Sequence, residues 1–449
     1  MKEKLFRKTS DTMTEGRPLK LILTFTFPVL CGDLFQIFYH IADSVIVGRY
    51  LGVDALAAVG STSALVFVIV YWIVGMTNGF GILLSQAYGA KDEYRLKHYT
   101  AMSFYLCAAM AVIMTAVLLI ANHPLLRIMN IPDSIFTDTS NYVAVIYAGL
   151  PATALYNMMA SIARAFGDSK TPLYFLILSS VLNVVLDLLF VAVLPFKVEG
   201  AAYATVLAQV VSAVLCTGFV WKKYEIIHFG KEERAFSQIT MKKLLTIGTP
   251  MALQYSVTGI GAMIVQSALN QLGAKYIAAH SAAMKVQNVV VQAYASMGVA
   301  LATYVGQNYG AGKIERIKQG VKKCMMAVAV YSAIIMFIGY FILPLCIPLF
   351  VDDPTGEIKE IAAQVFHITL WFYFVQGAIF VYRNALQGLG NGMIPMLGGI
   401  CEMAARVLVI VFLFGPFQFT AICLGDPAAW MAAIIPLVPY YYWYMNKVM

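Results

Sequence analysis

Long runs without a charged side chain recur from one end of the sequence to the other. They cover residues 55–90, 98–126, 139–163, 200–221, 244–274, 286–312, 324–351, 361–382, 384–401, 407–425 and 427–446. About 20 apolar residues cross a bilayer as one α-helix. Transmembrane barrels differ, because apolar and polar residues alternate along their strands. Two further stretches carry acids around Asp43 and Asp187, and one predicted helix joins the runs 384–401 and 407–425 through Glu402 and Arg406. The sequence therefore predicts an all-α polytopic membrane protein with twelve transmembrane helices.

The overall composition agrees with a protein that lives in the lipid bilayer. Of the 449 residues, 60% are hydrophobic and 12% are charged, and the mean hydropathy is +0.76. If the N-terminus is cytoplasmic, five of the 31 Lys and Arg residues fall in external loops: Arg49, Arg127, Lys197, Lys275 and Lys359. Because cytoplasmic loops carry an excess of basic residues, we expect both termini in the cytoplasm. The formal charge of +8 then reflects membrane orientation, and we expect no nucleic-acid partner.

The sequence contains an internal repeat. The segment SQAYGAKDEYRLK at 85–97 returns as GQNYGAGKIERIK at 306–318. Other pairs match at nearly the same spacing: Pro28 with Pro250, Leu51-Gly52 with Leu272-Gly273, and Gly167 and Pro172 with Gly390 and Pro395. Repeats of this kind are a common plan of membrane carriers.

The repeat predicts the division of the chain. Six helices in each repeat place the start of both halves on the same side of the membrane. We expect an N-terminal six-helix lobe at 15–222, a cytoplasmic linker loop at 223–237 and a C-terminal six-helix lobe at 238–446, with a cleft between the lobes. Gly89 and Gly310, in the two YGA turns, are predicted to serve turn geometry, and a binding role is the alternative.

The first predicted helix, within Lys20–Gly52, carries carboxylates in its interior. Twelve uncharged residues precede Asp33, and nine more precede Asp43. An acid inside the bilayer costs a few kcal/mol on insertion scales and is by default a functional candidate. Tyr39 and Asp43 are four residues apart and share a helix face. Pro28 lacks the backbone N–H of other residues, which weakens the helix near its start.

Further oxygen-bearing side chains are predicted in the same half. Asn183 and Asp187 are four residues apart in the fifth helix, which is otherwise almost entirely apolar. The sixth helix supplies Thr205 and the fourth supplies Asn157. Hard cations prefer oxygen ligands, so this set could hold Na⁺ or protons. The alternative is a polar network that only ties helices together.

Four motifs of the first half resemble those of a known transporter family. They are DSVIVGRYLGVDALAAVG at 43–60, SQAYGAKD at 85–92, RAFGDSKTPL at 164–173 and NVVLD at 183–187. Together they resemble the multidrug and toxic compound extrusion (MATE) transporters, in their prokaryotic DinF-like branch, and the resemblance covers essentially the whole chain. It implies two pseudo-symmetric lobes arranged as a V, which export cationic or amphipathic compounds in exchange for H⁺ or Na⁺ by alternating access.

The resemblance also implies roles for individual residues. The coupling acids would be Asp43 and Asp187, and Pro28 would let the first helix bend. The side chains that bind the ion or join its network would be Asn183, Thr205, Tyr39 and Asn157. If Na⁺ is the ion, its ligands would come from Asp43, Asn183, Asp187 and Thr205. Such a transporter needs no cofactor besides the ion, and we expect a monomer in the plasma membrane of a bacterium.

The second half departs from another branch of the family, which places an essential glutamate in its seventh helix. No acid occurs between Glu233 and Glu315 in this sequence, and the seventh helix offers Gln254 and Gln266 instead. Ion coupling is therefore expected to depend on the acids of the first half.

Charged side chains nevertheless fall within the predicted helices of the second half. They are Lys285, Arg383, Glu402 and Arg406, with His280 close to Lys285. Glu402 and Arg406 are four residues apart, a spacing that favours an ion pair, and Lys285 is the alternative partner. The other interpretation is a substrate site in which Glu402 attracts a cationic compound. The residues predicted for that site are Glu402, Arg406, Lys285 and Gln254.

Other classes of function fit the sequence less well. A flippase for lipid-linked oligosaccharides, from the same superfamily, would need fixed basic residues for pyrophosphate, and only Lys285, Arg383 and Arg406 qualify. An intramembrane enzyme would need a nucleophile or metal motif, but neither H-E-x-x-H nor GxSxG is present. A channel would pass ions without substrate, whereas acids buried in one lobe suit a carrier better. We therefore expect a transporter and not an enzyme.

Overall fold

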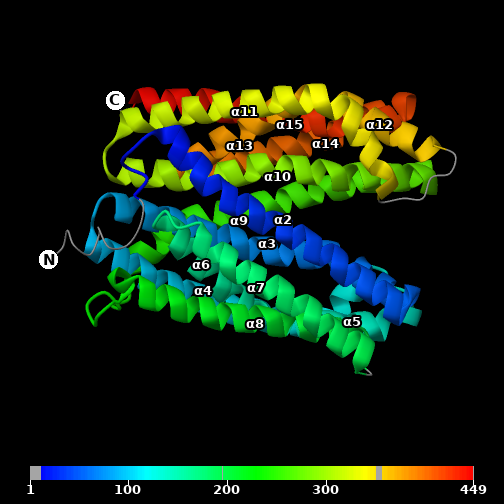
Figure 1. The fold of residues 1–449 in the computed structure, drawn as a ribbon, viewed down its shortest axis with the longest axis horizontal. Coiled ribbons are helices and arrows are strands. Elements are labelled where there is room, and N and C mark those ends of the chain that lie inside the picture. The colour runs from blue at the N-terminus through cyan, green and yellow to red at the C-terminus, as the bar shows by residue number, and fades with distance from the viewer. Residues whose placement is uncertain (1–11, 195, 350–355, 448–449) are drawn as a thin grey trace. The chain divides into compact units, whose positions relative to one another are not determined.

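The computed structural model describes residues 12–194, 196–349 and 356–447. These residues form helices and no strand (Figure 1). The main helices are α2 (Pro18–Leu51), α3 (Val53–Gly89), α4 (Glu93–Ile128), α5 (Asp133–Ala148), α6 (Leu150–Ala165), α7 (Lys170–Asp187), α8 (Val198–Lys223), α9 (Gln238–Leu269), α10 (Ala274–Gly310), α11 (Ile314–Ile342), α12 (Glu357–Thr369), α13 (Tyr373–Gly388), α14 (Met393–Phe417) and α15 (Phe419–Lys447). The prediction of an all-α polytopic membrane protein is confirmed.

Ten spans of the described chain are long and apolar enough to cross a membrane. The pair α5 and α6, bent by 42° where they meet, makes an eleventh. α9 occupies the place of the predicted seventh helix and is 32 residues long, but it is not among the helices apolar enough to be counted. The twelve predicted helices thus correspond to eleven apolar spans and the more polar α9. The end of the run 324–351 lies outside the described residues.

Two of the charge-free runs do not correspond to helices of their own. The runs 384–401 and 407–425 meet in α14, which continues through both Glu402 and Arg406 and so agrees with their predicted place inside a helix. Similarly, α13 continues for five residues beyond Arg383. A charged residue ends a membrane helix only if it has to reach water, and these side chains are buried against partners of opposite charge.

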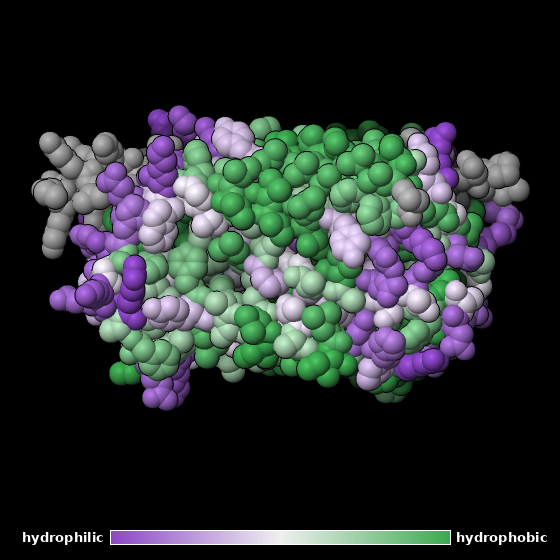
Figure 2. Space-filling model, turned by 90° about the horizontal axis from the view of Figure 1, so that it is seen from below, coloured by the Kyte–Doolittle hydropathy of each residue, from purple (hydrophilic) through white to green (hydrophobic). Residues whose placement is uncertain are grey.

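The surface of the helices is suited to lipid. Large apolar side chains such as Ile120, Val193 and Phe341 are more than 70% exposed. Figure 2 shows that apolar residues cover the middle of the visible face, while hydrophilic residues gather at its two ends. This distribution is expected for helices that cross a hydrocarbon layer and end in the polar interface.

The described chain divides into two compact units. Unit 1 comprises residues 27–252, and unit 2 comprises residues 13–26 and 253–449. α2 passes from unit 2 to unit 1 just before Pro28, and α9 passes from unit 1 to unit 2 just after Pro250. The lobes predicted at 15–222 and 238–446 stay a prediction about the sequence repeat.

The repeat is visible in the backbone of both units. α3 and α10 each have 37 residues, and each follows a glycine with positive φ, Gly52 at 87° and Gly273 at 92°. After both helices the chain makes the same turn, in which the N–H of Lys91 bonds the carbonyl of Tyr88 and that of Gly312 bonds Tyr309.

The glycines of the two YGA motifs lie at the ends of helices and not at the left-handed positions of the turns. Gly89 and Gly310 are the last residues of α3 and α10. The left-handed conformation that closes the turn is adopted two residues later, by Lys91 at φ 53° and Gly312 at φ 69°. The left-handed positions of the turn are thus Lys91 and Gly312. Glycine is favoured where φ is positive, so the turn gives no such reason for glycine at 89 and 310.

An apolar core in unit 1 surrounds the region of the predicted ion site. Val47, Ala58, Ile73 and Val143 are fully buried in one cluster that draws on α2, α3, α4, α5, α6 and α8. The cluster also includes Ile46, three residues after Asp43. The acids of unit 1 are therefore held among tightly packed apolar side chains.

α3 and α9 pack against each other through small residues within unit 1. A Cβ atom placed on Gly75 would lie 2.5 Å from the Cα of Ala252, and one on Gly79 would lie 2.5 Å from the Cα of Gly248. Small residues at this spacing let two membrane helices approach closely.

This contact predicts that Gly79→Val destabilises the protein. Extra methyl groups in a close-packed contact cost about 1–3 kcal/mol or more, and here backbone would have to move. We expect a lower thermal unfolding midpoint of the detergent-purified protein. Gly218→Ala is the matched control, because nothing lies within 4 Å of its Cβ position. Equal midpoints for the Gly79 variant and the control would contradict the contact.

Candidate ion site and second-half polar network

Asp43 and Asp187 come together in unit 1. Asp43 is on α2, and Asp187 is the last residue of α7. Their carboxyl groups are close enough to interact directly, and Asp187 is 0% exposed. Apart from each other, both oxygens of Asp187 and Oδ1 of Asp43 have no hydrogen-bond donor among the described residues. The structure thus brings together two acids separated by 144 positions in the sequence.

The helix that carries Asp187 changes its winding at this residue. The next six residues, Leu188–Val193, form a π-helix. π-helical turns are rare and are often found at functional sites. Their wider winding changes the direction in which the following side chains point, so the end of α7 is locally irregular beside the acid pair.

Asn183 and Thr205 extend the site across α7 and α8. Asn183 is 2% exposed, and its Nδ2 donates a hydrogen bond of 3.2 Å to Oγ1 of Thr205. The Oδ1 atom of Asn183 is buried and receives no hydrogen bond from the described part of the chain. Asn183 therefore presents an oxygen to the same apolar surroundings as the carboxyl pair.

Two tyrosines lie near the acids. Tyr39, one turn before Asp43, interacts electrostatically with Asp43 and Asp187. Tyr142 on α5 interacts with the same two acids and with Tyr39. Sequence reasoning missed Tyr142, because nothing in its own segment indicates which helix α5 packs against.

Asn157 and Pro28 have other surroundings. Nδ2 of Asn157 donates to the carbonyl oxygen of Thr153 at 2.9 Å, within its own helix α6. Asn157 makes no hydrogen bond to either carboxyl group of the pair, so it does not join the network through a direct bond. Pro28 is buried inside α2, where it leaves one carbonyl of the preceding turn without its usual N–H donor.

Asp168 fixes the start of α7 and hence the register of Asn183 and Asp187. Its Oδ1 accepts the N–H groups of Lys170 and Thr171 at 3.0 Å. Its Oδ2 accepts hydrogen bonds from Lys223 at 2.7 Å and Tyr224 at 2.6 Å. Partial burial would raise the pKa of this carboxyl group, but the hydrogen bonds to Lys223, Thr171 and Tyr224 outweigh it and lower the pKa.

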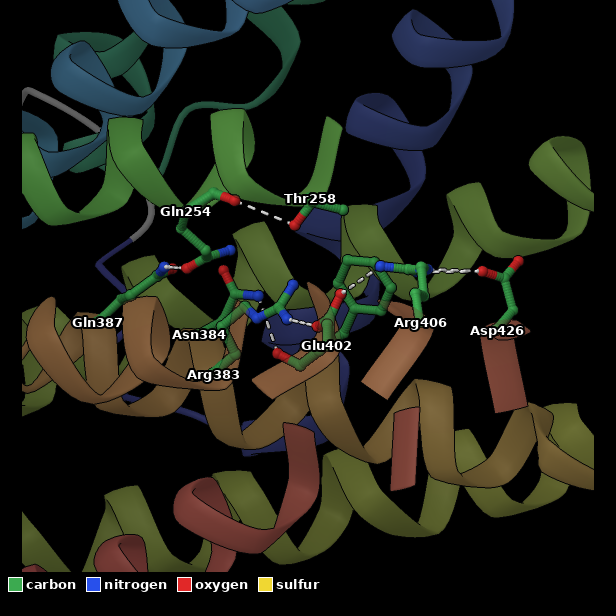
Figure 3. A network of polar contacts seen from close by, with 9 residues as sticks. Gln254, Thr258, Arg383, Asn384, Gln387, Glu402, Arg406 and Asp426 are labelled. Atoms are coloured by element: carbon green, nitrogen blue, oxygen red, sulfur yellow. Dashed lines mark hydrogen bonds and ion pairs between the residues drawn. The ribbon is translucent and has the colours of Figure 1, made fainter. Parts of the chain in front are cut away.

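Unit 2 contains a second polar network, formed by charges of both signs (Figure 3). A guanidinium nitrogen of Arg383 on α13 bonds Oε1 of Glu402 on α14. Arg406 bonds Oδ1 of Asp426 on α15 at 3.0 Å, and its Nη1 is 3.8 Å from Oε2 of Glu402. Arg383, Glu402 and Arg406 are each less than 10% exposed. The charges therefore alternate along the network and sum to zero.

The predicted Glu402–Arg406 pair is present, but it is the longest contact of this network. Arg383 and Asp426 provide the shorter ones. Asp426 was missed in the sequence, although it is the acid that directly ends the charge-free run 407–425. Lys285, the alternative partner, is an exposed residue of α10.

Gln254 is a buried residue of the same unit. It is 2% exposed, and its Oε1 accepts a hydrogen bond of 3.1 Å from Gln387 on α13, as Figure 3 shows. Gln266, near the end of this helix, is exposed and bonds Asn270. Hence α9 joins the interior of unit 2 through an amide pair and brings no charge there.

The two clusters differ in what they can bind. In unit 1, carboxyl and amide oxygens lack donors, an arrangement that suits a proton or a hard cation. In unit 2, acids and arginines neutralise one another. No group of three or more His, Cys, Asp and Glu side chains suited to a metal ion occurs within the described ranges.

Comparison with known proteins agrees with this architecture. A family model described as MatE matches twice, at residues 28–189 and 250–412. The two matches begin at Pro28 and Pro250 and confirm the internal repeat. Together they cover well over half of the chain.

The individual relatives are distant but nearly full-length. The probable multidrug resistance protein YoeA of Bacillus subtilis (strain 168) is 26% identical over 94% of this chain and 93% of its own length. The probable multidrug resistance protein NorM of Thermotoga maritima (strain ATCC 43589 / DSM 3109 / JCM 10099 / NBRC 100826 / MSB8) is 24% identical over 93% and 89%. A solved structure titled "Outward-facing conformation of a multidrug resistance MATE family transporter of the MOP superfamily" has a TM-score of 0.89 at 21% identity, covering 97% of this chain and 98% of its own.

The contacts of Asp168 predict a pH-dependent stability. A carboxyl group whose pKa is lowered on folding stabilises the protein above its unfolded-state pKa, and this contribution is lost as the pH falls through the folded-state pKa. Asp168→Asn should therefore lower the free energy of unfolding at pH 7 by about 1–3 kcal/mol, as for hydrogen bonds to charged groups. The variant should lose less of its remaining stability on acidification than wild type. Parallel pH profiles of the unfolding midpoint would contradict this role.

The network of unit 2 predicts strong dependence on both signs of charge. Glu402→Gln should lower the free energy of unfolding by about 3–5 kcal/mol, because it leaves the buried Arg383 without its carboxylate. The double variant Arg383→Met with Glu402→Met should be more stable than Glu402→Gln. Titration with a denaturing detergent measures these energies. The matched control is Glu357→Gln, which removes an exposed ion pair with Lys275 and should change the energy by less than about 1 kcal/mol.

Proposed function

Because the chain belongs to the MatE family, whose members are membrane transporters and not enzymes, we propose that it is a secondary active multidrug antiporter. It exports cationic or amphipathic compounds by alternating access, in exchange for H⁺ or Na⁺. The relatives named as multidrug resistance proteins support this choice of substrate. The protein acts as a monomer in the plasma membrane of a bacterium, with both termini in the cytoplasm.

The observation that carries the proposal is the group of buried oxygen atoms in unit 1. Oδ1 of Asp43, both carboxylate oxygens of Asp187 and Oδ1 of Asn183 are buried, and among residues 12–194, 196–349 and 356–447 they have no donor other than one another. Two neighbouring carboxylates in apolar surroundings repel each other. A bound proton or Na⁺ removes this repulsion, and the hydroxyl of Thr205 adds a further oxygen next to Asn183. Tyr39 interacts with both acids of this group, whereas Asn157 bonds within its own helix.

Occupation of this group drives export when it is coupled to a change in α2. One charge that moves inward through 100 mV supplies about 2.3 kcal/mol, and each pH unit supplies about 1.4 kcal/mol. Together these sustain a substrate gradient of about a hundredfold or more. Pro28 weakens α2 between the ion site and its N-terminal end, so α2 bends there when the occupancy changes.

Glu402 is the acid of unit 2 that attracts an organic cation. Arg406, Lys285 and Gln254 are the other residues predicted from the sequence for the substrate site. In the described structure Glu402 is already paired with arginines. A cation therefore competes with Arg383 for this carboxylate. The alternative function, a flippase for lipid-linked oligosaccharides, is less well supported, since Arg383 and Arg406 are both engaged by acids.

The ion site predicts that Asp43→Asn and Asp187→Asn abolish coupling. The measurement is the accumulation of ethidium inside inside-out vesicles with an imposed pH or Na⁺ gradient. In such vesicles, uptake into the lumen corresponds to export from the cell. Both variants should reduce gradient-driven accumulation at least about tenfold, the factor that corresponds to about 1.4 kcal/mol of lost coupling energy. The gradient that supports transport in wild type identifies the ion.

Asp33→Asn provides a matched control, because Asp33 lies on the same helix α2 but outside the interacting pair of acids. This variant should retain gradient-driven accumulation. Full uphill export by the Asp43 and Asp187 variants, at wild-type amounts of protein, would refute the coupling role.

A further inference from the structure

The repeated loop after α10 holds a segment from the other end of the chain. Met13 lies five residues before α2 and is 2% exposed. Its N–H donates to Oε1 of Gln307 at 2.8 Å, and its carbonyl oxygen accepts from Nδ2 of Asn308 at 3.1 Å. Gln307 and Asn308 are themselves 0% exposed. Both polar groups of the Met13 backbone are thus paired inside unit 2, nearly 300 residues away in sequence.

Two basic residues after α10 complete these contacts. Nζ of Lys313 donates to the carbonyl of Thr14 at 3.0 Å. Arg316 donates to the carbonyl of Gly16 at 3.0 Å, to that of Met13 at 3.4 Å and to Oδ1 of Asn308 at 3.0 Å. We call this set, Gln307, Asn308, Lys313 and Arg316, the α10–α11 clamp. All four residues belong to the repeated motif GQNYGAGKIERIK.

The clamp binds the backbone of the segment. Its bonds end on the carbonyl oxygens of residues 13, 14 and 16 and on one N–H. Bonds from charged donors are stronger than bonds between neutral groups. The clamp therefore fixes the position of the chain just before α2 begins.

Unit 1 has a corresponding contact, made by other residues. His98 on α4 bonds the carbonyl of Glu233 at 2.9 Å and the hydroxyl of Thr240 at 3.1 Å. Tyr105 donates to the carbonyl of Arg234 at 3.4 Å. The segment that leads into α9 is therefore held by α4. Each half of the sequence thus holds the entrance to the first helix of the other half, through α4 in the first half and through the end of α10 and the start of α11 in the second.

The division into units agrees with these contacts. Residues 13–26, which include the start of α2, belong to unit 2, and α2 belongs to unit 1 from Phe27 onward. Asp43 lies in the second part. α2 is thus one helix whose beginning is fastened to unit 2 and whose later turns carry an acid of the ion site.

We propose that the α10–α11 clamp positions α2 for energy coupling. The clamp keeps residues 13–26 attached to unit 2 throughout the transport cycle, so that a change of α2 at the ion site acts on unit 2. If the clamp were removed, a change of α2 at the ion site would displace residues 13–26 and would not act on unit 2. This inference rests on the proposed antiport function. It assigns the clamp residues a role through α2 and no contact with ion or substrate.

The clamp predicts a separation of coupling from transport. Purified full-length protein in liposomes is tested with ethidium in two ways, by accumulation driven by an ion gradient and by equilibration without one. The variant Asn308→Ala with Arg316→Ala should lose accumulation at least about fivefold, the lower range of coupling energies between sites. Its equilibration rate per folded protein should stay at the wild-type level. A proportional loss of both, as expected of a merely structural role, would overturn the inference.

A reversible cross-link tests the same inference without breaking the fold. Cysteines at Thr14 and Lys313, joined by a cleavable bifunctional thiol reagent, should leave gradient-driven accumulation intact. In the Arg316→Ala background, the cross-link should restore accumulation, and cleavage should abolish it again. A cross-link that blocks transport until it is cleaved would show that the segment has to leave unit 2, which would overturn the proposal.

Two controls complete the experiment. Thr14→Cys alone, treated with the same reagent, accounts for the seven native cysteines. His98→Ala loosens the contact before α9, a helix without an acidic residue, and should slow transport without uncoupling it. If wild type itself shows no gradient-driven accumulation, the antiport function and the inference fail together. If the Asp43 and Asp187 variants lose accumulation but the clamp variants behave as wild type, the inference alone fails.

Discussion

The hydrocarbon interior of a membrane offers no water to pair with a buried polar atom. The two polar clusters of this protein meet that constraint in opposite ways. In unit 2, Arg383, Glu402, Arg406 and Asp426 neutralise one another. In unit 1, Oδ1 of Asp43, both carboxylate oxygens of Asp187 and Oδ1 of Asn183 find no donor in the described parts of the chain besides one another. A cation is the missing partner of the second kind of cluster, and this contrast is the physical basis for assigning ion coupling to unit 1.

The internal repeat preserves the backbone while the side chains diverge. Gly167 and Gly390 both have positive φ at the turn before α7 and α14. Counted from these glycines, Asn183 and Arg406 stand at the same position, 16 residues on. One helical scaffold thus presents an amide oxygen in one half and a guanidinium in the other. The same backbone geometry occurs twice, with buried oxygens that lack a donor in one copy and with paired charges in the other.

Much of the architecture could be predicted from the sequence because membrane helices and repeats leave local signals. The sequence alone shows the lengths of the charge-free runs, the repeated YGA motif, and Asp43 and Asp187 within apolar segments. The pairing of Arg383 with Glu402 was not predictable, because it depends on how α13 packs against α14. For the same reason Tyr142 was missed, and Asn157 was placed in a network that it does not bond directly.

Other differences came from local structure that has no sequence signature of its own. The π-helix after Asp187 lies within an apolar run that reads as ordinary helix. The left-handed turn residue Lys91 is not a glycine, so the neighbouring Gly89 attracted the prediction instead. α13 likewise continues past Arg383, because this side chain pairs with Glu402 inside the protein.

The alternating charges of unit 2 have a consequence for biosynthesis. Arg383 is the sole charged residue of α13, and Glu402 is synthesised 19 residues later. An unpaired arginine within a membrane helix is costly, by about 2.5–3.5 kcal/mol at the helix centre on insertion scales. The carboxylate that pairs with Arg383 is present only after α14 has been synthesised, and the shorter contact of Arg406 needs Asp426 of α15. The charge pairs of the last three helices are therefore complete only when all three have left the ribosome.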